Sequence, residues 1–256
     1  SLFSKYSDQI AAIILEPMTT EEPCDVEGVN FLQFLRNICD QNGALLILDE
    51  MITGFRYHLS GAQTMFNVIP DLSTFGKGMA NGFSLSALCG KREIMSLGGI
   101  KEKNLERTFL LSSTHGAEMS SLGAFVKTLE IYKEENVVDH IHRYGSRLKS
   151  EINSISSDLG ILDNFYVAGP DCSPVYVTKN KNFENCLKMR TIFNSCMIEE
   201  GVLIPWIAIS LSHDNLIMEK TLSAIKKSLK IYTRAIENPE SFIRGEVIQP
   251  VFRKYN

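Results

Sequence analysis

The chain has 256 residues, of which 44% are hydrophobic, so it can bury a sizeable core as one large domain or two smaller ones. Its formal net charge of −4 argues against a nucleic-acid partner, because proteins that bind nucleic acid usually present a basic face. Its six cysteines form no CxxC pair and share no metal-ligand spacing with the five histidines, which predicts free thiols in a reducing compartment and no metal site. No stretch approaches the roughly 20 apolar residues of a membrane span, and residues 1–6 lack the apolar core of a signal peptide, so we expect no membrane partner and a cytoplasmic location.

The first half of the chain alternates short apolar runs with a helical pattern. The runs cover residues 10–15, 44–48, 72–75 and 84–89. Residues 30–40, between the first two runs, repeat their apolar side chains with a helical period. This alternation predicts an α/β fold with strands of a mainly parallel sheet that is buried on both faces. Because ligands gather at the carboxyl ends of such strands, Glu16 and Asp49, which follow the first two runs, are expected to face a site.

A carboxylate and a lysine follow two of these predicted strands. Asp49 ends the second run, and Lys77 lies between two glycines just after the third. Pyridoxal phosphate needs an amine that holds it covalently and an acid that keeps its ring nitrogen protonated, so that the ring draws electrons from the substrate carbon. A lysine in a glycine-flanked loop is more often a solvated surface residue, and an aspartate at a strand end often caps a turn. Together, however, Lys77 and Asp49 predict a pyridoxal phosphate site.

Four further residues are candidates on weaker grounds. Met51 lies two residues after Asp49, so an extended chain would place its thioether on the same side, against the cofactor ring, although a core methionine explains the spacing equally well. Thr114 precedes a predicted long helix, where a hydroxyl and free N–H groups suit a phosphate, or where the threonine is simply an N-cap. His115 and Glu21 are candidate substrate contacts, but Glu21 belongs to a Thr-Thr-Glu-Glu-Pro turn that can equally be a solvated loop.

The second half of the chain predicts a smaller α+β unit. The helix that opens at Thr114 is followed by another that ends near residue 155. Strands are expected at residues 165–168, 174–178, 202–203 and 208–211. Helices are expected at residues 182–200, with Gly201 as a C-cap, and at 214–236, with Asp214 as an N-cap. We therefore expect domains at residues 1–133 and 134–240, followed by an extended arm at 241–256.

Several motifs occur in an order and spacing that together are a strong signal of one family. They are AAIILEP at residues 11–17, DEMITGFR at 49–56, GAQ at 61–63, PDL at 70–72, GK at 76–77 and GKREIM at 90–95. With these motifs the chain resembles the class III pyridoxal-phosphate-dependent aminotransferases, and most closely their glutamate-1-semialdehyde aminomutase-like branch. The resemblance runs from about residue 8 into the smaller unit.

The resemblance implies a fold and a set of roles. The fold is fold type I of the pyridoxal-phosphate-dependent transferases, with the C-terminal part of the large-domain sheet and a small C-terminal α+β domain. Lys77 is similar to the Schiff-base lysine of the family and Asp49 to the partner of the ring nitrogen, while Met51 takes the place where valine usually lies against the ring. Thr114 is similar to the threonine that reaches the cofactor phosphate of the neighbouring subunit, which implies a homodimer with shared active sites.

The chain departs from the family pattern in three places. The glycine-rich phosphate loop and the ring-stacking aromatic residue are not among these 256 residues, so we expect a C-terminal part that binds cofactor poorly and is inactive alone. The sequence His115-Gly116-Ala117-Glu118 replaces the usual one after the threonine. Residues 207–213 contain no arginine, although members of the ornithine and 4-aminobutyrate type place one there, which argues against that type.

The leading prediction is an aminotransferase that moves an amino group from a small-molecule donor to an aldehyde or ketone acceptor, such as a sugar or a semialdehyde. The sequence leaves two alternatives open. One is an aminomutase of the glutamate-1-semialdehyde 2,1-aminomutase type, which moves nitrogen between neighbouring carbons of one skeleton with the same lysine and aspartate. The other is a non-catalytic, truncated interaction domain that keeps the α/β core.

Overall fold

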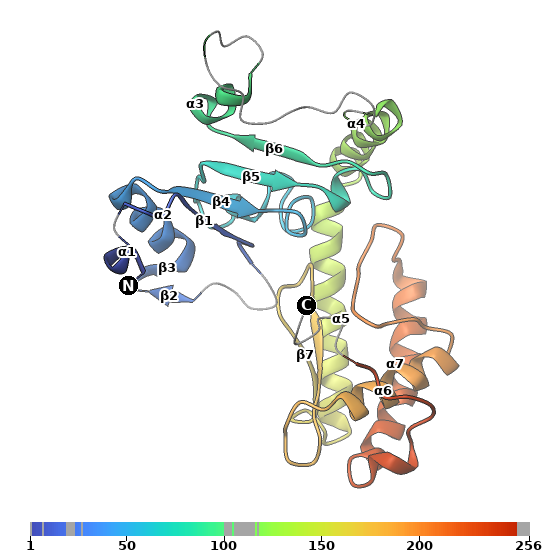
Figure 1. The fold of residues 1–256 in the computed structure, drawn as a ribbon. Coiled ribbons are helices and arrows are strands. Elements are labelled where there is room, and N and C mark those ends of the chain that lie inside the picture. Colours follow the sequence, from blue (N-terminus) through green and yellow to red (C-terminus); the bar gives the residue numbers. More distant parts are fainter. Residues whose placement is uncertain are drawn as a thin grey trace. The chain divides into compact units, whose positions relative to one another are not determined.

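The computed structural model describes residues 2–6, 8–18, 24–26, 28–99, 104, 116 and 118–249 (Figure 1). They form two compact units, Ser1–Asp139 and His140–Asn256. Each unit has its own sheet and its own buried side chains, so the two are described separately. None of the described helices is both long enough and apolar enough to cross a membrane.

The first unit is built on a four-stranded sheet with the strand order β1-β4-β5-β6. The strands are β1 (Ala12–Leu15), β4 (Leu45–Asp49), β5 (Leu72–Phe75) and β6 (Ala87–Gly90). β1 pairs with β4 and β4 with β5 in parallel, while β6 runs antiparallel to β5. The expected mainly parallel sheet is therefore confirmed, and each of the four apolar runs overlaps one of its strands.

Helix α2 (Phe31–Asn42) packs the core of the first unit against this sheet. The side-chain oxygen of Asn30 caps it by accepting a hydrogen bond of 2.9 Å from the Leu32 N–H, and Gly43 ends it in the left-handed conformation with φ of 63°. Its apolar face forms one buried cluster with β4. The cluster consists of Leu32, Leu35, Cys39, Ala44, Leu46, Leu48 and Val68.

The other elements of the first unit are short, except for one helix. They are α1 (Leu2–Lys5), the hairpin β2 (Asp25–Val26) and β3 (Val29–Asn30), α3 (Arg92–Met95), α4 (Met119–Glu134) and the 3-10 turns η1 (Ala62–Thr64), η2 (Lys77–Met79) and η3 (Ser96–Gly98). The long helix was expected to open at Thr114, which lies outside the described residues; α4 begins at Met119. Its N-cap is Glu118, whose ψ of 128° is not helical.

The buried carboxylate of Asp71 holds the start of β5 to its neighbours. Its Oδ2 accepts hydrogen bonds from the Leu46 N–H at 2.7 Å and from Arg36 at 2.8 Å, and its Oδ1 pairs with Lys91 Nζ at 2.6 Å. Burial by itself raises the pKa of Asp71, but the hydrogen bonds from Lys91, the Leu46 amide and Arg36 outweigh it and lower this pKa to about 2. One ionised side chain thus joins α2, β4, β5 and the end of β6.

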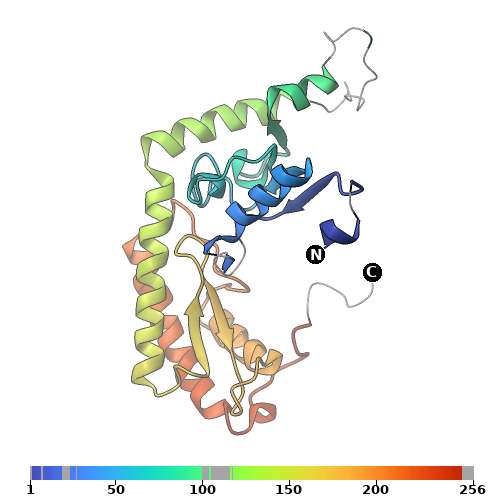
Figure 2. The ribbon, with the colours of Figure 1, turned by 90° about the vertical axis from the view of Figure 1, so that its left-hand side faces the viewer.

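The second unit packs three helices with an antiparallel hairpin (Figure 2). Its elements are α5 (Val137–Asp158), β7 (Phe165–Ala168), β8 (Val175–Thr178), α6 (Leu187–Glu199), α7 (Asn215–Ala235) and the 3-10 turn η4 (Pro239–Ser241). The ring of Phe165 lies at the centre of its core, with ring centroids of Phe193 at 4.7 Å and Tyr232 at 5.4 Å. The predicted N-cap Asp214 is confirmed, because its side chain accepts a 2.8 Å hydrogen bond from the Ile217 N–H.

The outer edge of β7 is covered by a side chain of α5. Asn153 Nδ2 donates to the Val167 carbonyl at 2.9 Å, and Asn153 Oδ1 accepts from the Val167 N–H at 2.7 Å. This side chain therefore takes the donor and the acceptor that a further strand would use at this point of the edge.

Two expected strands, at residues 202–203 and 208–211, are wrong. Both lie in a stretch without regular secondary structure. Side chains bind its carbonyl groups in place of a strand partner: the Tyr176 hydroxyl lies 3.0 Å from the carbonyls of Ile204 and Pro205, and Arg190 donates to Pro205 O at 2.7 Å. Pro205 also has no N–H to donate to a neighbouring strand, which disfavours strand pairing at this point.

The helix expected from residue 182 begins later, at Leu187. The residues before it fold back beside β8, where the Cys186 N–H donates to the Thr178 carbonyl at 2.9 Å. Gly201 follows the end of this helix with φ of 79°, as predicted. In the expected arm, residues 242–249 form no regular element, and the Ile248 N–H donates to Thr191 Oγ1 at 2.9 Å.

Replacing Asp71 with alanine is expected to destabilise the first unit by about 3–5 kcal/mol, because it leaves the Leu46 N–H without an acceptor and the buried Arg36 charge with only its exposed partner Asp40. Hydrogen exchange of the amides in β4 and β5 measures this loss. The matched control is Asp40→Ala: Asp40 pairs with the same arginine at 2.7 Å, but its side chain is 61% exposed, so its removal should cost less than about 1 kcal/mol. Equal losses in the two variants would contradict the role given to Asp71.

The same carboxylate predicts a pH dependence. The pKa of Asp71 is about 2 in the folded chain, against an ordinary value of 3.8 for an aspartate without these partners. The unfolded chain therefore binds this proton more readily. The stabilisation is present above about pH 4 and is lost as the pH falls towards about 2. In urea titrations across this range, the unmodified chain should lose more stability than Asp71→Asn, which has no such proton; parallel profiles would refute the assignment.

Candidate active site

The carboxyl ends of β4 and β5 bring two polar side chains to one edge of the first sheet. Asp49 is the last residue of β4 and stands opposite Thr74 in the parallel pairing with β5. Lys77 follows three residues after Thr74, as the first residue of the 3-10 turn η2. This edge is where parallel sheets place their ligands.

Asp49 is half-buried and keeps one oxygen free for a ligand. Its Oδ1 accepts hydrogen bonds from the Thr74 hydroxyl and from the Met51 N–H, both at 3.0 Å. These two bonds fix the plane of the carboxylate. Within the described part of the chain, no hydrogen bond to Oδ2 is seen, so it can accept one from a group bound at this edge.

Lys77 is exposed and lies in an unusual backbone conformation. Its φ of 46° is in the left-handed region, which costs an L-residue roughly 1–2 kcal/mol. The turn that holds it there includes hydrogen bonds from the Met79 N–H to the Gly76 carbonyl at 3.0 Å and from the Asn81 N–H to the Lys77 carbonyl at 3.2 Å. Residues with strained backbones cluster at functional sites, so this conformation supports a functional role for Lys77.

Met51 lies beside the backbone that precedes Lys77. Its sulfur would stand 2.8 Å from a Cβ placed on Gly76, so the thioether fills the space that a side chain at this glycine would occupy. The structure therefore brings Met51 to the same edge as Asp49 and Lys77.

The buried carboxylate of Glu50 shapes the loop beside this edge, a role that the sequence analysis missed. It accepts hydrogen bonds from the N–H groups of Ala62 and Gln63, both at 2.8 Å, and from the Thr53 hydroxyl. Gly61 approaches it with φ of 91°, and a Cβ there would lie 2.6 Å from Oε1. The sequence signal for this role is the motif DEMITGFR followed by GAQ. In it Thr53 follows Glu50 by three residues and Gly61 follows it by eleven.

An aromatic cluster supports the end of β5 from α4. Phe55, with φ of 63°, makes edge-on contacts with Phe75, Phe125 and Tyr132 at centroid distances of 6.2, 6.1 and 5.9 Å. Burial raises the pKa of the Tyr132 phenol, against the opposing effect of the Arg56 charge. Phe75 is two residues before Lys77, so this packing reaches the lysine turn.

Three predicted site residues lie outside the described residues: Glu21, Thr114 and His115. Glu16, the other strand-terminal acid, is exposed after β1. In the described ranges no group of three or more histidine, cysteine, aspartate or glutamate side chains is arranged to hold a metal ion.

Comparison with known proteins gives concordant matches. Residues 1–204 match the family described as Aminotransferase class-III. The chain is 34% identical over 250 residues to a glutamate-1-semialdehyde 2,1-aminomutase of Methanosphaera stadtmanae, which covers 90% of this chain and 56% of that protein. It is 32% identical over 227 residues to a 3-aminobutyryl-CoA aminotransferase of Cloacimonas acidaminovorans, with coverage of 87% and 53%. The chain thus spans about half the length of the curated relatives it matches.

A solved structure described as a transaminase with PLP bound, where PLP is pyridoxal phosphate, has a similar fold. Its TM-score is 0.79 at 20% sequence identity, covering 92% of this chain and 55% of that one. This likeness confirms the expected fold class, fold type I.

Replacing Glu50 with alanine should release the loop at residues 53–63. The change leaves two buried N–H groups and one hydroxyl without their charged acceptor, which we expect to cost about 3 kcal/mol. Hydrogen exchange in that loop should rise well above its level in Glu93→Ala, a control that removes an exposed glutamate of α3. Unchanged protection of the loop would contradict this role of Glu50.

Proposed function

We propose, because the chain belongs to the class-III aminotransferases, that it carries the catalytic lysine and aspartate of a pyridoxal-phosphate-dependent aminotransferase. Family membership confirms the resemblance predicted from the motifs, and the relatives include the aminomutases of the predicted branch. The reaction we propose moves an amino group from a small-molecule donor to an aldehyde or ketone acceptor. The observation that carries the proposal is that Asp49 ends β4 and Lys77 begins the turn just after the adjacent parallel strand β5, at one edge of the sheet.

The residues present at this edge fit pyridoxal phosphate. Oδ2 of Asp49 is a free acceptor in a fixed plane, suited to the N–H of a protonated pyridine ring. The Lys77 side chain is exposed, so its amine is accessible to an aldehyde. The Met51 thioether lies beside Gly76, the residue before Lys77, and is suited to contact a cofactor ring, a contact worth roughly 0.3–1.5 kcal/mol.

In this proposal each side chain has a separate task. Pyridoxal phosphate, when bound, supplies a ring that draws electrons from the substrate carbon. Oδ2 of Asp49 would accept the hydrogen bond of the ring N–H and so favour the protonated ring nitrogen. Lys77 would hold the cofactor through its Nζ, and the same amine, when free, would accept a proton from the substrate Cα and pass it on.

Several further assignments belong to the whole protein. We propose that Thr114 reaches the cofactor phosphate of a neighbouring subunit in a homodimer with shared sites, and that Glu21 and His115 face the substrate. In this assignment residues 1–133 belong to the cofactor-binding large domain, 134–240 form the small domain and 241–256 form an arm. Because the chain spans about half of its relatives, we expect these 256 residues alone not to turn over substrate. A cytoplasmic location remains our expectation.

An aminomutase is the second candidate function. It is favoured by the 34% identity to the Methanosphaera stadtmanae protein, which is named as a glutamate-1-semialdehyde 2,1-aminomutase. Both reactions use the same lysine and aspartate, so site geometry does not separate them. Conversion of a single amino-semialdehyde without an added amino donor would establish the aminomutase, and a strict need for a donor would exclude it.

Treatment with pyridoxal phosphate and borohydride should attach a pyridoxyl group to Lys77, which peptide mapping by mass spectrometry detects. The Lys77→Ala variant should lose this adduct and, in a catalytically competent form of the protein, all transamination. Lys127→Ala serves as the control, because Lys127 is an exposed lysine of α4 in an ion pair with Glu130. Labelling spread evenly over surface lysines, with none preferred at Lys77, would support the non-catalytic alternative instead.

A further inference from the structure

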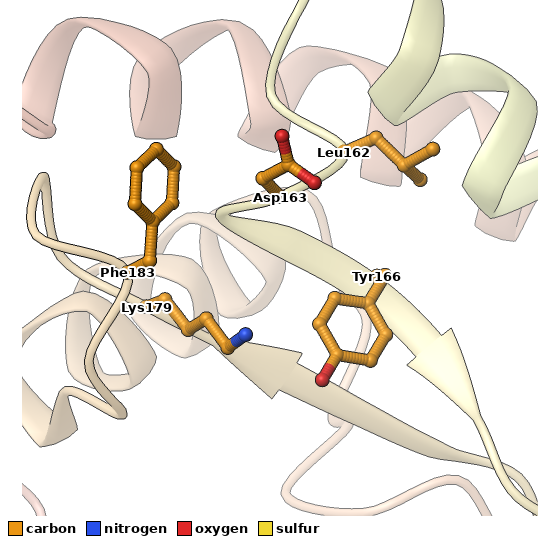
Figure 3. Close-up of a pocket in the computed structure, with 5 residues that line it drawn as sticks. All are labelled: Leu162, Asp163, Tyr166, Lys179 and Phe183. Atoms are coloured by element: carbon orange, nitrogen blue, oxygen red, sulfur yellow. The ribbon is translucent and has the colours of Figure 1, made fainter.

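The second unit has a pocket between the loop that enters β7 and the turn that follows β8. Its volume is about 480 Å³, and its lining residues are Leu162, Asp163, Tyr166, Lys179 and Phe183 (Figure 3). Small-molecule sites typically have volumes of roughly 300–1,000 Å³. None of these residues belongs to the proposed cofactor site, so the pocket is independent of the function proposed above.

Two opposite charges line the pocket without pairing with each other. Figure 3 shows the Asp163 carboxylate beside the Phe183 ring and the Lys179 amine beside Tyr166. The Lys179 Nζ lies 5.1 Å from the centre of the Tyr166 ring, and neither charge has an ion-pair partner among the residues that the structure describes. A ligand that carries one positive and one negative group would complement both.

The rim of the pocket is apolar. Leu162 is 42% exposed and Phe183 is 55% exposed, which is unusual for two large apolar side chains that face one hollow. Phe183 has φ of 61°, a conformation that bulky residues rarely adopt, and its N–H donates to the Asn180 carbonyl at 3.0 Å. The Asn180 side chain fixes the same turn by accepting from the Asn182 N–H at 2.9 Å. The ring is therefore held at the rim by the turn beneath it.

The base of the pocket is also fixed in place. The buried Tyr232 hydroxyl lies 3.0 Å from the Asn164 carbonyl and 2.9 Å from the Lys179 carbonyl, and it accepts the Lys179 N–H at 3.0 Å. Asn164 Nδ2 donates to the Asn180 carbonyl at 2.7 Å. These bonds fix the backbone beside Asp163 and at Lys179, so the two segments that carry the charges are held together before any ligand arrives.

We propose that this pocket binds a free α-amino acid with an aromatic side chain. Asp163 receives the α-ammonium group, Lys179 receives the α-carboxylate, and the side chain packs against Phe183. A phosphate would be repelled by the negative charge of Asp163, and a polyamine by the positive charge of Lys179. A zwitterion instead offers each side chain a group of the opposite charge.

The test is calorimetric titration of the 256-residue chain with L-phenylalanine in the absence of added pyridoxal phosphate. Phenethylamine lacks the carboxylate and 3-phenylpropionate lacks the ammonium group, so each should bind about tenfold more weakly, the loss of one charge-assisted contact. Asp163→Asn and Lys179→Met should each weaken phenylalanine binding about tenfold. Asp163→Asn should not weaken 3-phenylpropionate, and Lys179→Met should not weaken phenethylamine.

Two control variants show whether binding depends on the two pocket charges in particular. Lys181→Met removes an exposed charge from the same turn and should leave binding unchanged. Lys77→Ala should also leave it unchanged, and this result holds whether or not Lys77 is catalytic. The proposal is overturned if phenylalanine does not saturate at millimolar concentration, if neither pocket variant weakens it, or if Lys77→Ala abolishes it.

Discussion

The parallel pairing of β4 with β5 is the constraint on which the candidate site depends. Asp49 and Lys77 are 28 positions apart in the sequence, and only the register that sets Asp49 opposite Thr74 brings the aspartate to the lysine turn. Two polar contacts hold this register from its ends. At one end Asp71, just before β5, binds the Leu46 N–H of β4, and at the other the Thr74 hydroxyl binds Asp49. A slip of one residue would break both bonds and turn the side chains of β5 to the opposite face.

Asp49 and Glu50, two adjacent acids at the end of β4, have different roles because their surroundings differ. Asp49 retains a free oxygen in a half-buried position, as a ligand-binding group requires. Glu50 is fully buried, and both of its oxygens bind the loop that follows. Successive side chains of an extended chain point to opposite sides. Asp49 therefore faces the candidate site, whereas the next residue, Glu50, faces the loop that it holds in place.

Much of the fold could be predicted from the sequence where local signals agree with long-range packing. Residues 165–168 and 72–75 form strands as predicted, and Asp214 caps its helix, because alternation and capping are local properties. The stretch 202–211 was misassigned since its carbonyls are bound by Tyr176 and Arg190, residues that no local pattern links to it. Because ligands bind at the carboxyl ends of parallel strands, the sequence also predicted the sheet edge that Asp49 and Lys77 share. This rule could not predict the role of Glu50, whose amide partners lie 12 and 13 positions away.

The two hydrogen bonds between Asn153 and Val167 protect the edge of β7 from pairing with other chains in a concentrated solution. A bare strand edge is a template on which another chain can add a strand, and such pairing starts aggregation. Asn153 occupies both the donor and the acceptor of Val167 with one amide. An aliphatic residue of similar size at position 153 would keep the packing of α5 but uncover this part of the strand edge, so the substitution would lower solubility as well as stability.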